Sequence, residues 1–162
     1  MVSQHFALTE YIPVTSTLYQ ERGEKSIQLL DKCLVDCVEY LWECVAAKYA
    51  PYSTMILING KCPVTGKVYT ESGWRSADTK TGSRWSQHKN SKAADVKVYY
   101  HDGKKWVKVD PKDVYALIMA NEANFIKLGL TTMEDLEFTP TWNHIDTRWW
   151  GVPVNKLVIV QP

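Results

Sequence analysis

A long run of apolar residues at helical spacing constrains the first third of the chain. Between Glu24 and Tyr49, apolar side chains recur at three- and four-residue steps, namely Ile27, Leu30, Leu34, Val38, Leu41 and Val45. This spacing predicts an amphipathic helix with one apolar face. The helix should end before Pro51, because the residue preceding a proline disfavours helical conformation. Cys33, Cys37 and Cys44 flank the apolar face, which favours reduced thiols in packing positions over disulfides or a metal cluster.

The rest of the chain alternates between strand and helix patterns in a mixed order. Strands are expected at 53–58, 67–72, 141–149 and 156–160, and the segment 95–110, DVKVYYHDGKKWVKVD, predicts a hairpin. Asp102-Gly103 is a pair typical of tight hairpin turns. Asp110 followed by Pro111 predicts the start of a second helix, which should end near Gly129. This order of elements favours an α+β fold.

The length and composition of the chain limit the classes of function. A chain of 162 residues with 45% hydrophobic residues fits one domain spanning 1–162. The formal charge is +1 and no basic block stands out, which argues against a nucleic-acid surface. No apolar run approaches the ~18 residues of a membrane span. The N-terminus lacks the basic and apolar regions of a secretory signal, so none is expected.

Two histidines and one aspartate form a candidate metal site. His88 lies in a polar segment, and Asp95 follows it at the start of the hairpin strand. His144 lies in a later strand. Three nitrogen or oxygen donors with a fourth position left open are typical of catalytic zinc. The spacing alone is weak support, because a hydrogen-bonded surface histidine and an ordinary strand-capping aspartate would give the same pattern.

The strand that carries His144 has an unusual set of side chains on one face. Because strand side chains alternate, Trp142, His144, Asp146 and Arg148 should point the same way. An indole, an imidazole, a carboxylate and a guanidinium suit a cleft wall better than a core. The alternative is a solvent-exposed strand face with a ladder of charged groups. Arg75, after the strand at 67–72, could bind a carboxylate or a developing oxyanion.

Taken in order, three motifs resemble the zinc D-alanyl-D-alanine carboxypeptidase family. They are SGWRS at 72–76, SQHKNSKAAD at 86–95 and WNHID at 142–146. This family includes phage endolysins and vancomycin-resistance dipeptidases. The resemblance covers nearly the whole chain, and it implies a Hedgehog/DD-peptidase-like fold, in which helices pack on a small antiparallel sheet.

The same resemblance implies roles for individual residues. Zinc would be held by His88, Asp95 and His144. Arg75 would stabilise the tetrahedral intermediate or bind a substrate carboxylate. Ser86 and Trp142 would lie near the substrate.

Two positions depart from the family pattern. Ser91 occupies the position of the usual glycine in the second motif. Thr141 stands three residues before His144, where many members carry the acidic general base. That role therefore needs another residue. Asp146, on the predicted strand face of His144, is the first candidate, and Glu137 in the preceding loop is the second.

The leading hypothesis is therefore a zinc metallopeptidase that cuts a stem peptide of bacterial peptidoglycan, as a carboxypeptidase or an endopeptidase. A catalytically silent cell-wall-binding or virion-structural module is the alternative that Thr141 suggests. A plain housekeeping domain that binds no metal is the third. With no secretory signal expected, the first hypothesis favours a phage-encoded lysin held in the host cytoplasm until release, or a virion-associated one.

Overall fold

The nine-residue strand β4 (Ala93–His101) is the centre of the structure, a computed structural model that describes residues 2–80 and 86–161. It pairs with β1 along one edge and with β5 and β7 along the other. The sheet continues from β7 to β6 and then β8. The bounds are β1 Ser53–Leu57, β5 Trp106–Lys108, β6 Thr132–Glu134, β7 Asn143–Asp146 and β8 Val158–Val160. A separate small sheet pairs β2 (Gly60–Lys61) with β3 (Val68–Tyr69).

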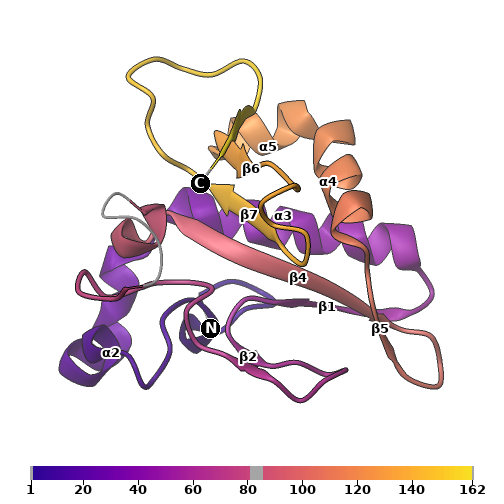
Figure 1. Ribbon diagram of the computed structural model, residues 1–162, viewed down its shortest axis with the longest axis horizontal. Coiled ribbons are helices and arrows are strands. Elements are labelled where there is room, and N and C mark those ends of the chain that lie inside the picture. The colour runs from indigo at the N-terminus through magenta and orange to yellow at the C-terminus, as the bar shows by residue number, and fades with distance from the viewer. Residues whose placement is uncertain (1, 81–85, 162) are drawn as a thin grey trace.

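Helices cover one face of this sheet. Figure 1 shows α3 running behind β4, with α4 and α5 beside it. The helices are α1 Leu8–Tyr11, α2 Thr17–Arg22, α3 Lys32–Tyr49, α4 Pro111–Ala120 and α5 Glu122–Leu128, with 3-10 turns η1 Gly23–Leu29 and η2 Gln87–Asn90. The predicted α+β class is confirmed. The sheet is antiparallel except for β6 and β8, which are parallel.

The first predicted helix is shorter than the apolar pattern suggested. It begins at Lys32, because the side chain of Asp31 accepts hydrogen bonds from the amides of Cys33 (2.8 Å) and Leu34 (3.3 Å). Such a cap satisfies amides that the first helical turn leaves unpaired. The preceding 3-10 turn leaves Ile27 45% exposed, so that residue lies outside the apolar face. All four cysteines are free, and Cys37 is buried as predicted, whereas Cys33 is exposed.

The later local predictions agree better with the structure. The predicted hairpin β4–β5 is present, but its loop spans residues 102–105 because His101 pairs with Trp106, so it is longer than a two-residue turn at Asp102-Gly103. Gly103 in this loop has a φ of +93°. Asp110 caps α4 by accepting from the amide of Lys112 at 2.8 Å, with Pro111 as the first helical residue. The predicted second helix is interrupted at Asn121, and its second part, α5, ends at Gly129 in left-handed conformation.

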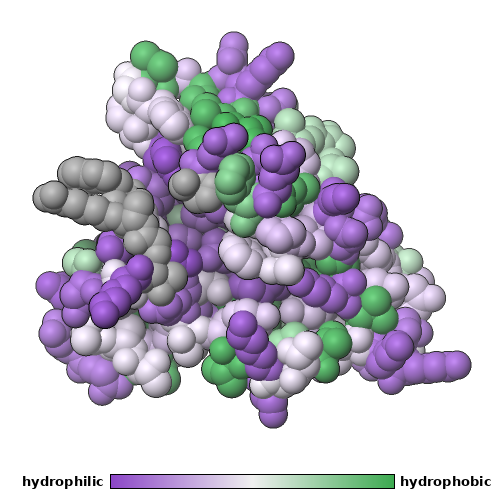
Figure 2. Space-filling model, in the orientation of Figure 1, coloured by the Kyte–Doolittle hydropathy of each residue, from purple (hydrophilic) through white to green (hydrophobic). Residues whose placement is uncertain are grey.

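Both faces of β4 are buried. Ala94, Val96 and Val98 point into the main core against the helices. Asp95 and Lys97 point to the opposite face, which β3 covers through Tyr69. In the view of Figure 2 the surface is hollowed and mainly hydrophilic where β4 begins. Within the described residues, no helix combines the length and apolar composition that crossing a membrane requires.

Candidate metal centre

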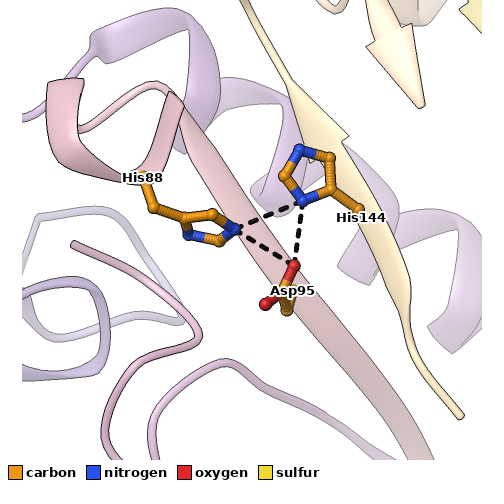
Figure 3. A group of neighbouring side chains, drawn as sticks. All are labelled: His88, Asp95 and His144. Atoms are coloured by element: carbon orange, nitrogen blue, oxygen red, sulfur yellow. Dashed lines mark hydrogen bonds and ion pairs between the residues drawn. The ribbon is translucent and has the colours of Figure 1, made fainter. Parts of the chain in front are cut away.

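The three predicted metal ligands converge on one point. His88 comes from the η2 turn, Asp95 from β4 and His144 from β7, and their side chains point toward one another (Figure 3). His88 Nε2 lies 3.2 Å from Asp95 Oδ1 and 3.2 Å from His144 Nδ1. His144 Nδ1 lies 2.9 Å from Asp95 Oδ1. All three residues are buried, and their donor atoms are close enough together to hold one metal ion.

The strand register explains why His144 reaches Asp95. In the antiparallel pair β4–β7, Asp95 is directly opposite His144. Directly opposed residues on one face place their side chains about 5 Å apart at the β-carbon. His88 returns to the same point through Ser91, which adopts a left-handed conformation with φ of +57°. Ser91 therefore takes the backbone conformation that glycine adopts most easily, and the loop closes with serine at this position.

Hydrogen bonds outside the cluster determine which nitrogen of each histidine faces the centre. His88 Nδ1 lies 2.7 Å from the carbonyl oxygen of Gly73, so this nitrogen carries the proton. His144 Nε2 lies 3.2 Å from Oδ2 of Asp146 and carries its proton there. The two nitrogens that face the centre are then both lone-pair acceptors. Histidines oriented in this way by a carbonyl or a carboxylate are typical metal ligands.

The electrostatics of the cluster call for a positive charge at its centre. Two acceptor nitrogens and a carboxylate oxygen repel one another at 2.9–3.2 Å unless a proton or a cation lies between them. Burial disfavours charge on His144, but its hydrogen bonds to Asp146 and Asp95 outweigh burial and raise its pKa to about 9. Burial lowers the pKa of His88. A metal ion bound at the centre would replace the proton that His144 otherwise holds.

Asp95 is the only carboxylate among the three. Burial would raise its pKa, but its contacts with the neighbouring His144 and His88 outweigh burial and hold the pKa well below its usual range. Its second oxygen, Oδ2, accepts from Arg75 at 2.7 Å. One oxygen of Asp95 thus faces the centre while the other is held by a guanidinium. The donor set of two imidazoles and one carboxylate suits zinc with an open fourth position.

The other predicted site residues are placed as follows. Arg75 contacts Asp95 and also donates to the carbonyl oxygen of Glu71. Trp142 and Arg75 line one pocket next to Asp95. Ser86 immediately precedes η2, and its carbonyl oxygen accepts from the amide of Lys89 at 3.0 Å. Its proposed contact with substrate stays a prediction.

The two predicted proton acceptors lie in different surroundings. Asp146 is fully buried, and both of its oxygens accept from the guanidinium of Arg148. Glu137 lies in an exposed turn, where its amide donates to Asp135. These contacts do not test either residue as a general base. The contacts of Asp146 with Arg148 and His144 favour a role as an anchor that orients His144.

A glutamate that the sequence reasoning missed lies beside the cluster. In the antiparallel pair β6–β7, Met133 is opposite Ile145, so the next residue of β6, Glu134, lies alongside His144 of β7. Glu134 Oε1 lies 3.7 Å from His144 Nδ1, and its side chain is 16% exposed. Burial raises the pKa of this carboxyl. The sequence signal was weak, since β6 has three residues and no motif surrounds Glu134.

Comparisons with known proteins do not name a family. No family model matches the chain, and neither the curated proteins nor the solved structures gave a match. The geometry of the His88–Asp95–His144 cluster and the three sequence motifs are therefore the features that bear on function.

Proposed function

We propose that this chain is a zinc-dependent peptidase that hydrolyses a peptide bond of bacterial peptidoglycan stem peptides, as a carboxypeptidase or an endolysin-type endopeptidase. The observation that carries the proposal is the convergence of His88, Asp95 and His144 with both histidines oriented by outside partners. The three motifs supply the substrate class, a peptide containing a D-amino acid. A phage-encoded lysin is the setting that this proposal favours.

Each residue of the site has a defined task in this proposal. Zinc, when bound, supplies Lewis acidity that makes water nucleophilic near neutral pH. Arg75 stabilises the negative charge that develops on the scissile carbonyl oxygen, because a fixed cation in a partly buried site is a strong electrostatic stabiliser. Trp142 packs against the substrate in the pocket that it shares with Arg75.

Glu134 is the general base in this proposal. Among the described contacts of His144, Glu134 is the one carboxylate that is neither a proposed ligand, as Asp95 is, nor bound to a guanidinium, as Asp146 is. A raised pKa suits proton transfer near neutral pH. Glu134 would take the proton of the attacking water and return it to the leaving amine. It would thus replace the acid that is absent at Thr141.

The proposal is tested by pairing Glu134→Gln with Glu137→Gln as a matched control. Purified protein should contain about one zinc per chain. Mass spectrometry of peptidoglycan incubated with the protein should show cleavage products, and a chelator should abolish them. Glu134→Gln should lower kcat about 10²–10⁴-fold, the usual contribution of a general base, while zinc content stays unchanged. Glu137→Gln should retain the wild-type rate.

Two results would contradict the proposal in different ways. If the digest shows no change in mass although the protein holds zinc and binds muropeptides, the chain is the catalytically silent module that Thr141 suggests. If Glu137→Gln loses activity and Glu134→Gln keeps it, the base lies in the exposed turn and Glu134 has no role in the chemistry.

A further inference from the structure

Asn59 is a buried side chain whose amide group joins separate parts of the chain. It lies between β1 and β2 and is 5% exposed. Its Oδ1 accepts from the amide of Ser72 at 2.9 Å. Its Nδ2 donates to the carbonyl oxygens of Glu10 (3.0 Å) and Tyr11 (3.4 Å), at the end of α1. Because a backbone amide donates and a carbonyl oxygen accepts, these partners determine which way the Asn59 amide points. Asn59 therefore ties Ser72 to the end of α1.

Ser72 begins a short segment, residues 72–75, that contacts two of the three candidate metal ligands. The carbonyl oxygen of Ser72 accepts from the amide of Asp95 at 2.7 Å. The carbonyl oxygen of Gly73 lies 2.7 Å from His88 Nδ1. Arg75 contacts both ligands, because its amide donates to the carbonyl oxygen of His88 at 3.2 Å and its guanidinium donates to Asp95 Oδ2 at 2.7 Å. A shift of this segment would thus move the groups that orient His88 and hold Asp95.

The support to which Asn59 is bonded belongs to the main core. Tyr11 is fully buried there, and its carbonyl oxygen also accepts from the amide of Trp74 at 2.8 Å. The backbone at Gly73 passes close to this support, since a β-carbon there would lie 2.2 Å from the carbonyl oxygen of Tyr11 and 3.0 Å from Asn59 Nδ2. The residues on either side of Gly73 are therefore both held to the core, Ser72 by the side chain of Asn59 and Trp74 by the backbone of Tyr11.

We propose that Asn59 is a positioning residue of the candidate metal centre. Through Ser72 it holds the carbonyl of Gly73 where that carbonyl accepts the Nδ1 proton of His88, so that Nε2 of His88 faces the centre. Loss of a direct partner of a ligating histidine typically costs about 10–100-fold in metal affinity. Asn59 acts through such a partner, so the lower end, about 10-fold, applies. The inference rests on the metal centre of the proposed function but not on the peptidase reaction.

Asn59→Ala tests this inference by two measurements. Its zinc affinity, measured by competition with a chromophoric chelator, should be about 10-fold weaker than that of wild type. The second measurement is the exchange of the His88 Nδ1 proton with water in the metal-free protein, followed by NMR and assigned by the loss of the signal in His88→Ala. This proton should exchange faster in Asn59→Ala, because the carbonyl that accepts it is no longer held in place.

Asn121→Ala, at the junction of α4 and α5, is the matched control. Asn121 Nδ2 donates to the carbonyl oxygen of Leu117 at 2.9 Å, and its Oδ1 accepts from the hydroxyl of Tyr40 at 3.4 Å. Loss of either asparagine leaves hydrogen-bonding partners unpaired and should lower the melting temperature. Asn121→Ala should nevertheless keep the wild-type zinc affinity and the wild-type exchange of the His88 proton. If Asn59→Ala is poorly folded by its thermal melt, Asn59→Ser, which keeps a hydroxyl on the same β-carbon, decides the question by the same two measurements.

Three results would overturn the inference. Wild-type zinc affinity in Asn59→Ala would mean that Asn59 only fastens α1 to the end of β1. An equal loss of affinity in Asn59→Ala and Asn121→Ala would assign the effect to global stability. A weaker affinity with an unchanged His88 proton would exclude the route through Gly73.

The same measurements separate this inference from the proposed function. If zinc affinity responds to Asn59→Ala in a protein that never hydrolyses muropeptides, the positioning role stands and the peptidase is rejected. If the wild-type chain binds no zinc, the proposed function fails. The exchange of the His88 proton in the metal-free protein then decides whether Asn59 orients His88.

Discussion

Replacing Asp146 by asparagine tests whether this residue anchors His144 or transfers protons. The substitution keeps the shape of a side chain that is fully buried. It removes the charge that His144 Nε2 contacts at 3.2 Å and that Arg148 Nε contacts at 2.9 Å. The new amide has one acceptor oxygen in place of two, so either His144 or Arg148 then faces an NH₂ group.

The size of the effect follows from these contacts. Loss of a partner that orients a ligating histidine typically costs about 10–100-fold in metal affinity, which is about 1.4–2.7 kcal/mol of binding free energy. Removing one partner of a buried ion pair costs about 3–5 kcal/mol of the free energy of unfolding. The lower end applies here, because the side chain of Arg148 is 26% exposed and water can solvate its charge. At about 2–4 °C per kcal/mol for a chain of this size, metal-free Asp146→Asn should melt about 6–12 °C below wild type.

The zinc affinity of Asp146→Asn and of wild type is measured by competition with a chromophoric chelator. The kcat of both proteins is measured at saturating zinc. Asp102→Asn, in the exposed hairpin turn, is the control and should change neither quantity, because asparagine can accept the same bonds from Lys104 and Lys105. If Asp146 acts as an anchor, the kcat of Asp146→Asn should recover to within a few-fold of the wild-type value once zinc is saturating. Unchanged zinc affinity together with a kcat that stays about 10²-fold low would refute the anchoring argument and make Asp146 the proton acceptor.

Two further predictions concern the backbone around His88. Gly73→Ala should cost about 3 kcal/mol of stability, because a β-carbon there would lie 2.2 Å from the carbonyl oxygen of Tyr11. It should also weaken zinc binding, because the carbonyl of residue 73 that holds His88 would be displaced. The control is Gly103→Ala, whose β-carbon meets nothing within 4 Å, and its zinc titration should show no loss of affinity. Ser91→Gly should shift the free energy of unfolding by no more than about 1 kcal/mol, because glycine adopts the left-handed conformation easily. Ser91→Val, which places a β-branched side chain in that conformation, should lower both stability and zinc affinity. Equal denaturation midpoints for the two variants would count against the left-handed turn.

The parts of the fold that could be predicted well from the sequence are those determined by near neighbours. The hairpin loop that contains Asp102-Gly103 and the cap at Asp110 depend on residues within a few positions of each other, so local chemistry decides them. The start of α3 is also local, but the apolar spacing concealed it. Ile27 and Leu30 continue the helical spacing upstream of the helix, whereas the carboxylate of Asp31 caps the first turn and so sets where the helix begins. A capping residue inside an apolar pattern therefore determines the boundary better than the pattern does.

The candidate metal ligands and the proposed base differ in how readily the sequence reveals them. His88, Asp95 and His144 were predicted because their motifs keep a recognisable order, and the structure brings them together. Glu134 was missed because its position depends on β6 pairing beside β7, which is a contact between strands rather than a spacing along the chain. A three-residue strand carries too little periodicity to reveal its register.

The strand β4 shows a conflict between its sequence pattern and its surroundings. The alternation in DVKVYY favours a half-buried strand whose polar residues, Asp95 and Lys97, face water. The structure buries both, because Tyr69 of β3 lies over Lys97 and because Arg75 and two histidines contact Asp95. A carboxylate and an ammonium on a covered face of the central strand lose solvation and must be offset by groups supplied elsewhere. For Asp95 those groups are Arg75 and the two histidines of the candidate metal centre. For Lys97 they are Ser72 Oγ and the carbonyl oxygen of Asp95, which accept from its ammonium. The conflict between polar sequence and buried position thus points to the candidate metal centre more sharply than either observation alone.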